Sequence, residues 1–176
     1  MSLQWVWGRK ILIYVVILCK NKETSEAVKY LKERFPCFKN IKLFKVNGLH
    51  DMPTFEAPRE KPIHYKLHSE VISLLSPKWS ANCPDLIESL SQLNSNRPNP
   101  DCYIASQQLG GISNQTSKLS TSFIHRNSIW KPWINASWQA GNLKEREKCL
   151  EWLEEVWQTF EPNCPGVHAA QMHQHL

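Results

Sequence analysis

Nine consecutive apolar residues at positions 11–19 (ILIYVVILC) constrain the fold of this chain more than any other segment. A helix needs about 20 apolar residues to cross the hydrocarbon core of a bilayer, so this run is too short to span one. Five of its members are β-branched: Ile11, Ile13, Val15, Val16 and Ile17. The run therefore predicts a buried β-strand at residues 11–18.

A secretory signal peptide is the alternative interpretation of this segment. Arg9 and Lys10 precede the apolar run, which is the order of charge and apolar core in such peptides. The run is followed by Lys20, Asn21, Lys22 and Glu23, with no small-residue cleavage site. The residues that follow the run therefore favour the strand.

Along the rest of the chain, the predicted helices and strands do not alternate strictly, and elements of the same type follow one another. Apolar periodicity and proline positions predict helices at residues 24–35, within 64–75, at 84–93 and from 142 onward, and strands at 41–46, 102–109 and 129–138. Strict alternation of strand and helix would indicate a parallel sheet. This order instead favours an α+β fold, a mostly antiparallel sheet with helices packed on one face.

The length of 176 residues allows one globular domain of ordinary size. We expect residues 1–10 to form a lead-in, residues 11–162 a single domain, and residues 163–176 a frayed C-terminal remnant. The last helix has the clearest signals, because Asn142 suits the N-cap and Glu145 the third helical position. Cys149 falls on its apolar face, where a plain core thiol is expected.

The basic charge does not indicate a nucleic-acid partner. Residues 1–66 hold 13 Lys and Arg against 6 Asp and Glu, whereas residues 67–176 hold 8 against 10. The lysines of the first part stand singly between apolar residues, as on a solvated helix or strand. A nucleic-acid-binding chain gathers its basic residues into a stripe or a recognition module, and neither is present in the sequence.

The cysteines and histidines suggest neither a metal site nor a catalytic nucleophile. The 6 cysteines include no C-x-x-C pair, which argues against a zinc ribbon or a thioredoxin-type motif. Cys164, His168, His173 and His175 have the right ligand types for zinc, but their spacing matches no standard site. The composition leaves the redox compartment open.

Two tripeptides match the acceptor sequence for N-glycosylation, at Asn114 (NQT) and Asn135 (NAS). They favour a secretory or extracellular location. Nothing in the composition excludes the cytoplasm, so the location stays open.

An ordered series of motifs spans residues 109–138. Leu109, Gly110 and Gly111 are followed by SFIHR at residues 122–126 and then by a segment ending in Trp138. This series resembles the substrate-binding domain of the FAD-linked oxidases related to berberine bridge enzyme, in the vanillyl-alcohol oxidase superfamily. That family has Leu-Gly-Gly, then Ala-Phe-Pro-His-Arg, then a strand ending in Trp. Ile124 stands where the family usually has proline, and the resemblance covers roughly residues 8–172.

The resemblance implies an oxidoreductase fold that uses FAD and takes a small-molecule substrate. The resemblance also implies that the substrate pocket is lined by Gln107, His125, Arg126 and Trp138. Structural roles are the alternative at each position: Arg126 pairs with a carbonyl or carboxylate, and His125 is a hydrogen-bonded structural residue. Gln107 and Trp138 are then ordinary surface or core residues.

Two departures from the family bear on FAD. The family holds FAD mainly in a separate N-terminal domain with Gly-rich loops, and nothing in this sequence, with 6 Gly in all, supplies such a loop. The family's C-terminal Tyr-x-Asn, which lies near the flavin, falls on His168 and Ala170, so both of these cofactor-facing side chains are replaced. We therefore expect the chain alone to bind no FAD and to be an inactive fragment of an oxidoreductase. The alternative is a cofactor-free module that binds a small molecule or a protein, secreted and glycosylated.

Overall fold

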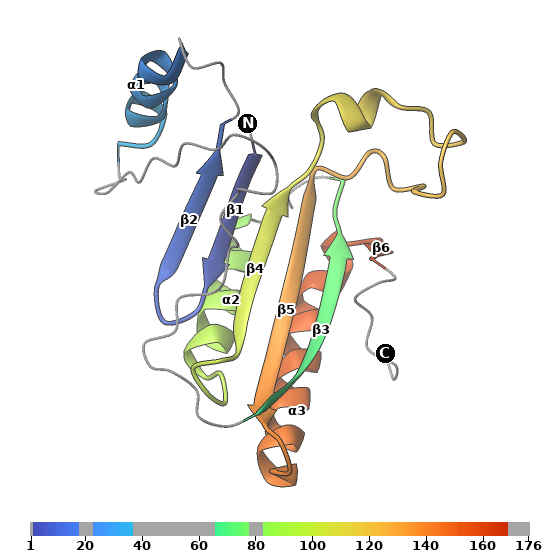
Figure 1. Ribbon diagram of the computed structural model, residues 1–176. Coiled ribbons are helices and arrows are strands. Elements are labelled where there is room, and N and C mark those ends of the chain that lie inside the picture. The colour runs from blue at the N-terminus through green and yellow to red at the C-terminus, as the bar shows by residue number, and fades with distance from the viewer. Residues whose placement is uncertain (1, 18–22, 37–65, 78–82, 169–176) are drawn as a thin grey trace. The chain divides into compact units, whose positions relative to one another are not determined.

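The computed structural model of the chain describes residues 2–17, 23–36, 66–77 and 83–168 (Figure 1). The chain divides into two compact units. Within the smaller one, helix α1 spans Thr24–Arg34, as predicted from its apolar stripe. The strand expected at residues 41–46 lies outside the described residues.

The larger unit is built on an antiparallel sheet. Its six strands lie in the order β2-β1-β4-β5-β3-β6, and every pairing with a described register is antiparallel (Figure 1). In chain order the strands are β1 (Ser2–Trp7), β2 (Ile11–Val16), β3 (Leu67–Leu75), β4 (Tyr103–Gln108), β5 (Trp130–Gln139) and β6 (Gly166–Val167).

Helices α2 (Cys83–Ser95) and α3 (Leu143–Phe160) cover one face of this sheet (Figure 1). The core between the layers joins strand residues such as Ile104 and Ile134 to α3 residues such as Leu153 and Phe160. The indole Nε1 of Trp152 donates a 2.7 Å hydrogen bond to the carbonyl of Leu93, which links α3 to α2. The predicted α+β class, with helices on one face of an antiparallel sheet, is confirmed.

Local signals define the start of α3. The Oδ1 of Asn142 accepts a hydrogen bond from the backbone N–H of Glu145, as the N-cap pattern predicts. Cys149 lies on the buried face of the helix with 0% exposure. Among the helices that the structure describes, none is long and apolar enough to cross a bilayer.

Three predictions about strands are wrong. Residues 67–75 form strand β3 where a helix was expected, because both sides of this strand are buried at its end and the apolar run hides the two-residue period. The strand of residues 11–16 lies at the sheet edge with Ile11 56% exposed and Ile13 42% exposed, so it is not buried. Residues 2–7, expected as a lead-in, form β1 within the sheet.

Candidate functional site

Strand register decides which side chains face away from α2 and α3. Ile104 of β4 pairs with Ile134 of β5, and both lie in the core beneath the helices. Side chains alternate along a strand and directly paired residues point the same way, so odd-numbered residues of β3, β4 and β5 lie on the opposite side. We call this side the second face. Its polar and aromatic members include Ser73, Tyr103, Gln107, Lys131 and Trp133.

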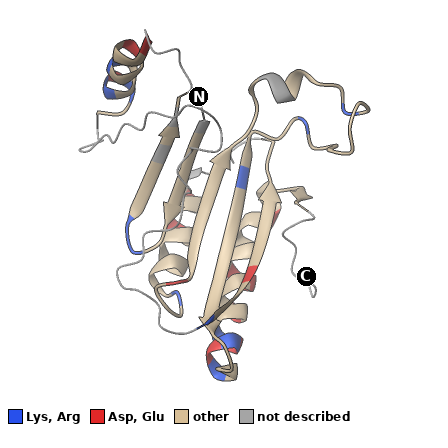
Figure 2. Ribbon diagram, viewed as in Figure 1, with Lys and Arg blue, Asp and Glu red and all other residues tan. Residues whose placement is uncertain are grey.

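Lys131 lies on the second face directly across from Gln107. It is the one charged residue of β5 (Figure 2), and it is half-buried between the neighbouring strands. Burial lowers the pKa of its ammonium group. No carboxylate of the described residues forms an ion pair with it. The sheet therefore holds a partly desolvated cation beside an amide side chain.

His168 reaches the same face from the end of β6. Its backbone N–H donates a 2.8 Å hydrogen bond to the carbonyl of Ser73, and Ser73 pairs with Trp133 on β5. Burial lowers the pKa of its imidazole, and the positive charge of Lys131 lowers it further. Its Nδ1 and the Oγ of Ser73 are both buried with no hydrogen-bond partner in the structure. Two buried polar atoms and one cation thus converge on this part of the sheet.

His125 lies beside this group, in the loop that joins β4 to β5. A Cβ atom built on Gly166 would approach the His125 ring to 2.7 Å, so the imidazole packs against the glycine backbone of β6. Gly166 pairs with Leu75, an odd-numbered residue of β3, and its Cβ direction therefore points to the second face. His125, Lys131 and His168 accordingly share this side of the sheet.

Arg126 is held within its own loop. Its guanidinium donates a hydrogen bond to the Oγ1 of Thr121, and its Cζ lies 5.3 Å from the centre of the Phe123 ring. The same ring lies 6.3 Å from the ring of His125, edge on. The partners of Arg126 are thus a hydroxyl and an aromatic ring, rather than the carbonyl or carboxylate of the structural alternative, and these contacts organise the loop that carries His125.

Trp138 lies on the helix-covered face, with 5% exposure. Its ring centre lies 6.0 Å from the Arg146 guanidinium carbon and 6.5 Å from the ring of His68. Gln107 and Trp138 are thus on opposite faces of the sheet, and the structure does not bring them together. The sequence motif locates Trp138 on the strand, but only the register shows which face it occupies.

The two glycosylation sequons occupy different environments. Asn114 is exposed in the 3₁₀ helix η3 (Gly111–Gln115), which the chain enters through Gly110 and Gly111, with φ values of 105° and 67°. Asn135 is only 8% exposed in β5. Its amide donates to the carbonyl of Asp101 at 3.0 Å and to the Oγ of Ser137 at 2.8 Å.

The remaining predicted site residue, Ala170, lies outside the described residues. Sequence analysis missed Lys131, Ser73 and Trp133. Of these, Lys131 had a usable signal, because a lysine inside the aromatic strand IWKPWI is unusual for a buried element. Ser73 had none, since its face follows from pairing with a distant strand.

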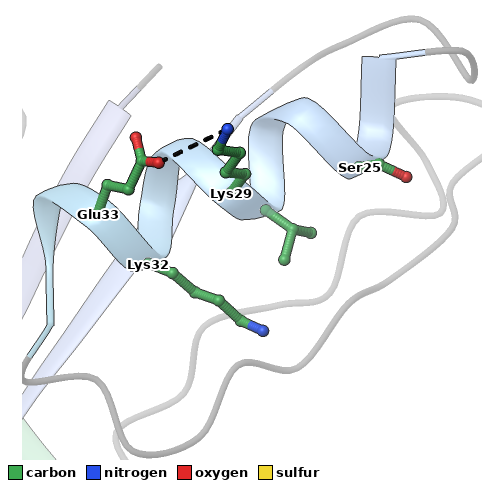
Figure 3. Close-up of a pocket in the computed structure, with 5 residues that line it drawn as sticks. Ser25, Lys29, Lys32 and Glu33 are labelled. Carbon is green, nitrogen blue, oxygen red and sulfur yellow. Dashed lines mark ion pairs between the residues drawn. The ribbon is translucent and has the colours of Figure 1, made fainter.

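A surface hollow of about 420 Å³ lies on α1. Its lining comes from Ser25, Val28, Lys29, Lys32 and Glu33, with Lys29 Nζ 4.0 Å from the Glu33 carboxylate (Figure 3). All five belong to a single helix, and none is a predicted site residue, so the hollow supports no functional assignment. The described residues also contain no cluster of three or more potential metal ligands.

Comparison with known proteins gives matches among solved structures, whereas no family model and no curated protein sequence matches. Berberine-bridge-enzyme-like protein 28 of Arabidopsis thaliana superposes with a TM-score of 0.66 at 15% identity over 99% of this chain. Berberine bridge enzyme of Eschscholzia californica gives 0.60 at 18% identity over 92%. A variant of that enzyme in complex with (S)-reticuline gives 0.64 at 16% identity over 93%. This chain has the fold of part of a berberine-bridge-enzyme-like protein.

The shared fold confirms the resemblance drawn from the motifs of residues 109–138. This chain spans 40% of the Arabidopsis chain and 34% of each of the two berberine bridge enzyme chains. It therefore has the fold of only part of each of these proteins. Activity and substrate do not follow from fold alone.

The N-termini of α2 and α3 do not offer a site for the diphosphate of FAD. Such a group is held by successive backbone N–H groups of a Gly-rich loop at a helix N-terminus. At α3 this place is taken by the helix's own residues: Asn142 accepts from the N–H of Glu145, and the Glu145 carboxylate accepts from the N–H of Gln139 at 3.1 Å. At α2 the first turn contains Pro84, which has no N–H, and the acidic Asp85. A carboxylate at each of these two positions repels an anion.

Proposed function

We propose that this chain forms the substrate-binding part of an FAD-linked oxidoreductase, with the second face of the sheet as its substrate surface. The observation that carries the proposal is the convergence of Lys131, His168 and Gln107 on one face beside Trp133. Small-molecule sites combine apolar or aromatic walls with a few well-placed polar groups, and this face has that composition. The shared fold with berberine-bridge-enzyme-like proteins supports the same assignment.

Each residue has a role that its surroundings suit. Lys131 would donate to an oxygen of the substrate, because its ammonium is partly desolvated and has no carboxylate partner among the described residues. His168 would exchange a proton with a substrate hydroxyl or amine, since its lowered pKa favours the neutral imidazole at neutral pH. Trp133 offers a ring against which a flat substrate packs.

FAD, when bound, supplies the hydride acceptor, which is chemistry that protein side chains lack. On this proposal residues other than those described hold its diphosphate, and this chain contributes the wall that covers the substrate. His168 and Ala170 would be the positions nearest the flavin, by the resemblance to the family's C-terminal motif. The chain by itself then binds ligand without oxidising it.

The proposal is tested by titrating the isotope-labelled chain with (S)-reticuline, simple phenols and sugars, and following backbone amide shifts by NMR. We expect a ligand to shift amides of β4, β5 and β6 around Lys131. K131M should weaken this binding by roughly tenfold or more, since hydrogen bonds to charged groups contribute about 1.5–3 kcal/mol. K144M is the matched control, because Lys144 is exposed on α3, and it should bind as the wild type does.

Two results would contradict the proposal. Shifts confined to α2 and α3, with none at Lys131, would place the ligand on the wrong side of the sheet. Equal affinity in K131M and K144M would remove Lys131 from the site. Separately, if the purified chain were yellow, with flavin absorbance at about 450 nm, it would hold FAD without the help of any other protein segment.

A further inference from the structure

Two thiols face each other in the core, on the side of the sheet away from the proposed substrate surface. Cys102 lies directly before β4, and Cys149 lies in the first half of α3. Both are 0% exposed, and their Sγ atoms are 3.7 Å apart. No step of the proposed function uses either residue.

The surroundings of the pair tolerate the loss of both S–H hydrogens. Both thiols donate to the carbonyl oxygen of Ser137, Cys149 at 3.3 Å and Cys102 at 3.7 Å. The amide of Asn99 donates to the same oxygen at 2.8 Å, and it also lies 3.5 Å from the Sγ of Cys149. If the thiols lost their hydrogens, the Ser137 carbonyl would keep its shortest hydrogen bond. No buried acceptor would be left unpaired.

We propose that Cys102 and Cys149 form an intrachain disulfide, tying α3 to the start of β4, when the chain folds in the presence of a low-molecular-weight disulfide such as oxidised glutathione. The Sγ–Sγ separation of 3.7 Å must contract to the bond length of about 2.05 Å, which small side-chain rotations supply. The two residues lie on packed elements, so no segment has to be drawn across the molecule.

The reaction proceeds by two exchanges. One cysteine, as thiolate, attacks a sulfur of oxidised glutathione, which forms a mixed disulfide and releases one glutathione. The second cysteine then attacks the protein sulfur of that mixed disulfide and releases the second glutathione. Two electrons pass from the cysteines to oxidised glutathione, and the two thiol protons end on the released glutathiones.

The closed, reduced chain should oxidise slowly. Burial raises the pKa of both thiols, that of Cys149 to about 12, so little thiolate is present at neutral pH. Neither sulfur is accessible to a reagent in the folded chain. The bond is therefore expected to form while the chain folds, or through an opening of α3 from the sheet, and to be protected once formed.

Cys164 provides a matched control. It is also buried, at 6% exposure, and burial likewise raises its pKa to about 12. Neither Cys102 nor Cys149 lies within hydrogen-bond distance of its sulfur. Cys164 is therefore buried and has a raised pKa, as Cys102 and Cys149 do, but neither of these cysteines is close enough to bond to it.

The test is to refold the full chain from denaturant in a mixture of reduced and oxidised glutathione, block free thiols with iodoacetamide, and map linked peptides by fragmentation mass spectrometry. We expect wild type and C164S to contain a link between residues 102 and 149, with a mass lower by about 2 Da than the reduced chain before blocking. The unfolding midpoint should rise by on the order of 5–10 °C over the reduced form. C102S and C149S should lack both effects.

Wild type with both residues fully alkylated after refolding would overturn the proposal. So would a stable link from either residue to a different cysteine, or a midpoint shift that persists in C149S. The peptide map of the wild type needs no variant to fold, so it decides the matter even if C102S or C149S is too unstable to study. Failure of this test leaves the substrate proposal untouched, because the two rest on opposite faces of the sheet.

Discussion

His168 makes the stability of this chain depend on pH. Its folded pKa lies below the ordinary value of 6.5, first through burial and then through the charge of Lys131. The unfolded chain therefore binds a proton more readily than the folded chain, and protonation favours unfolding. The contribution is complete above pH 6.5 and is lost as the pH falls through the folded pKa. We expect the urea midpoint to drop more between pH 7.5 and pH 5 in wild type than in H168Q.

The same pair gives a direct check by NMR. K131M removes the nearby cation, so the imidazole pKa of His168 should rise in this variant. K144M, which alters an exposed lysine of α3, should leave the titration of His168 where it is in wild type. An unchanged His168 titration in K131M would mean that the two side chains do not interact across the second face.

At the level of single residues, sequence analysis identified chemistry better than position. His125 was identified from its motif, and the structure places its ring against Gly166 beside the second face. Arg126 came from the same motif, yet its contacts are with Thr121 and Phe123 of its own loop. Neighbouring residues in a loop turn in different directions, and those directions depend on packing that a motif does not encode.

At the level of elements, the start of α3 carries a second prediction. Glu145 accepts hydrogen bonds from the N–H of Gln139 and from the amides of Asn142 and Asn99, while Asn142 caps its N–H. N142A should cost about 1 kcal/mol of stability, the usual loss for an N-cap. E145A should cost more, because it removes partners from the end of β5 and from Asn99 as well as from the cap.

Urea unfolding of both variants measures this order. E147A serves as the control, since Glu147 is exposed on the same helix and should change the free energy of unfolding by less than about 0.5 kcal/mol. If E145A proved no more destabilising than E147A, the hydrogen bonds that Glu145 accepts from Gln139 and Asn99 would make no net contribution to the free energy of unfolding.

The contrast between α3 and the strands shows which elements a sequence can predict. The start of α3 depends on residues within one turn of each other, and Asn142 with Glu145 predicted it correctly. The edge position of β2 depends on which strand lies beside it, so the apolar run of residues 11–19 did not reveal that Ile11 is 56% exposed. Strand order is a long-range property, whereas helix caps are local.

For the whole molecule, the second face shows the same limit more sharply. Gln107, Lys131 and His168 come from three strand regions separated by tens of residues, and they meet only because the registers of β4, β5, β3 and β6 align them. A shift of one residue in any register would move a strand's side chains to the other face. The sequence could therefore predict which residue types form the candidate site, but not which individual residues come together in it.

Glycosylation offers a prediction that tests the whole fold. A glycan needs an asparagine whose side chain leads into open space, because the attached sugars cannot be buried. Asn114 is exposed in η3, whereas Asn135 is 8% exposed and donates to Asp101 and Ser137. If the chain is expressed through a secretory pathway, we expect the folded, secreted fraction to carry a glycan at Asn114 and none at Asn135.

Digestion with an N-glycosidase and peptide mass spectrometry measure the occupancy of each sequon. N114Q should abolish the mass shift on digestion, whereas N135Q should keep it. N135Q should also be less stable than N114Q, because the longer amide must fit the buried position between Asp101 and Ser137 without the native hydrogen bonds. A glycan on Asn135 in the folded fraction would contradict the burial of this side chain against Asp101 and Ser137, since the side chain would then have to lead outward from the surface.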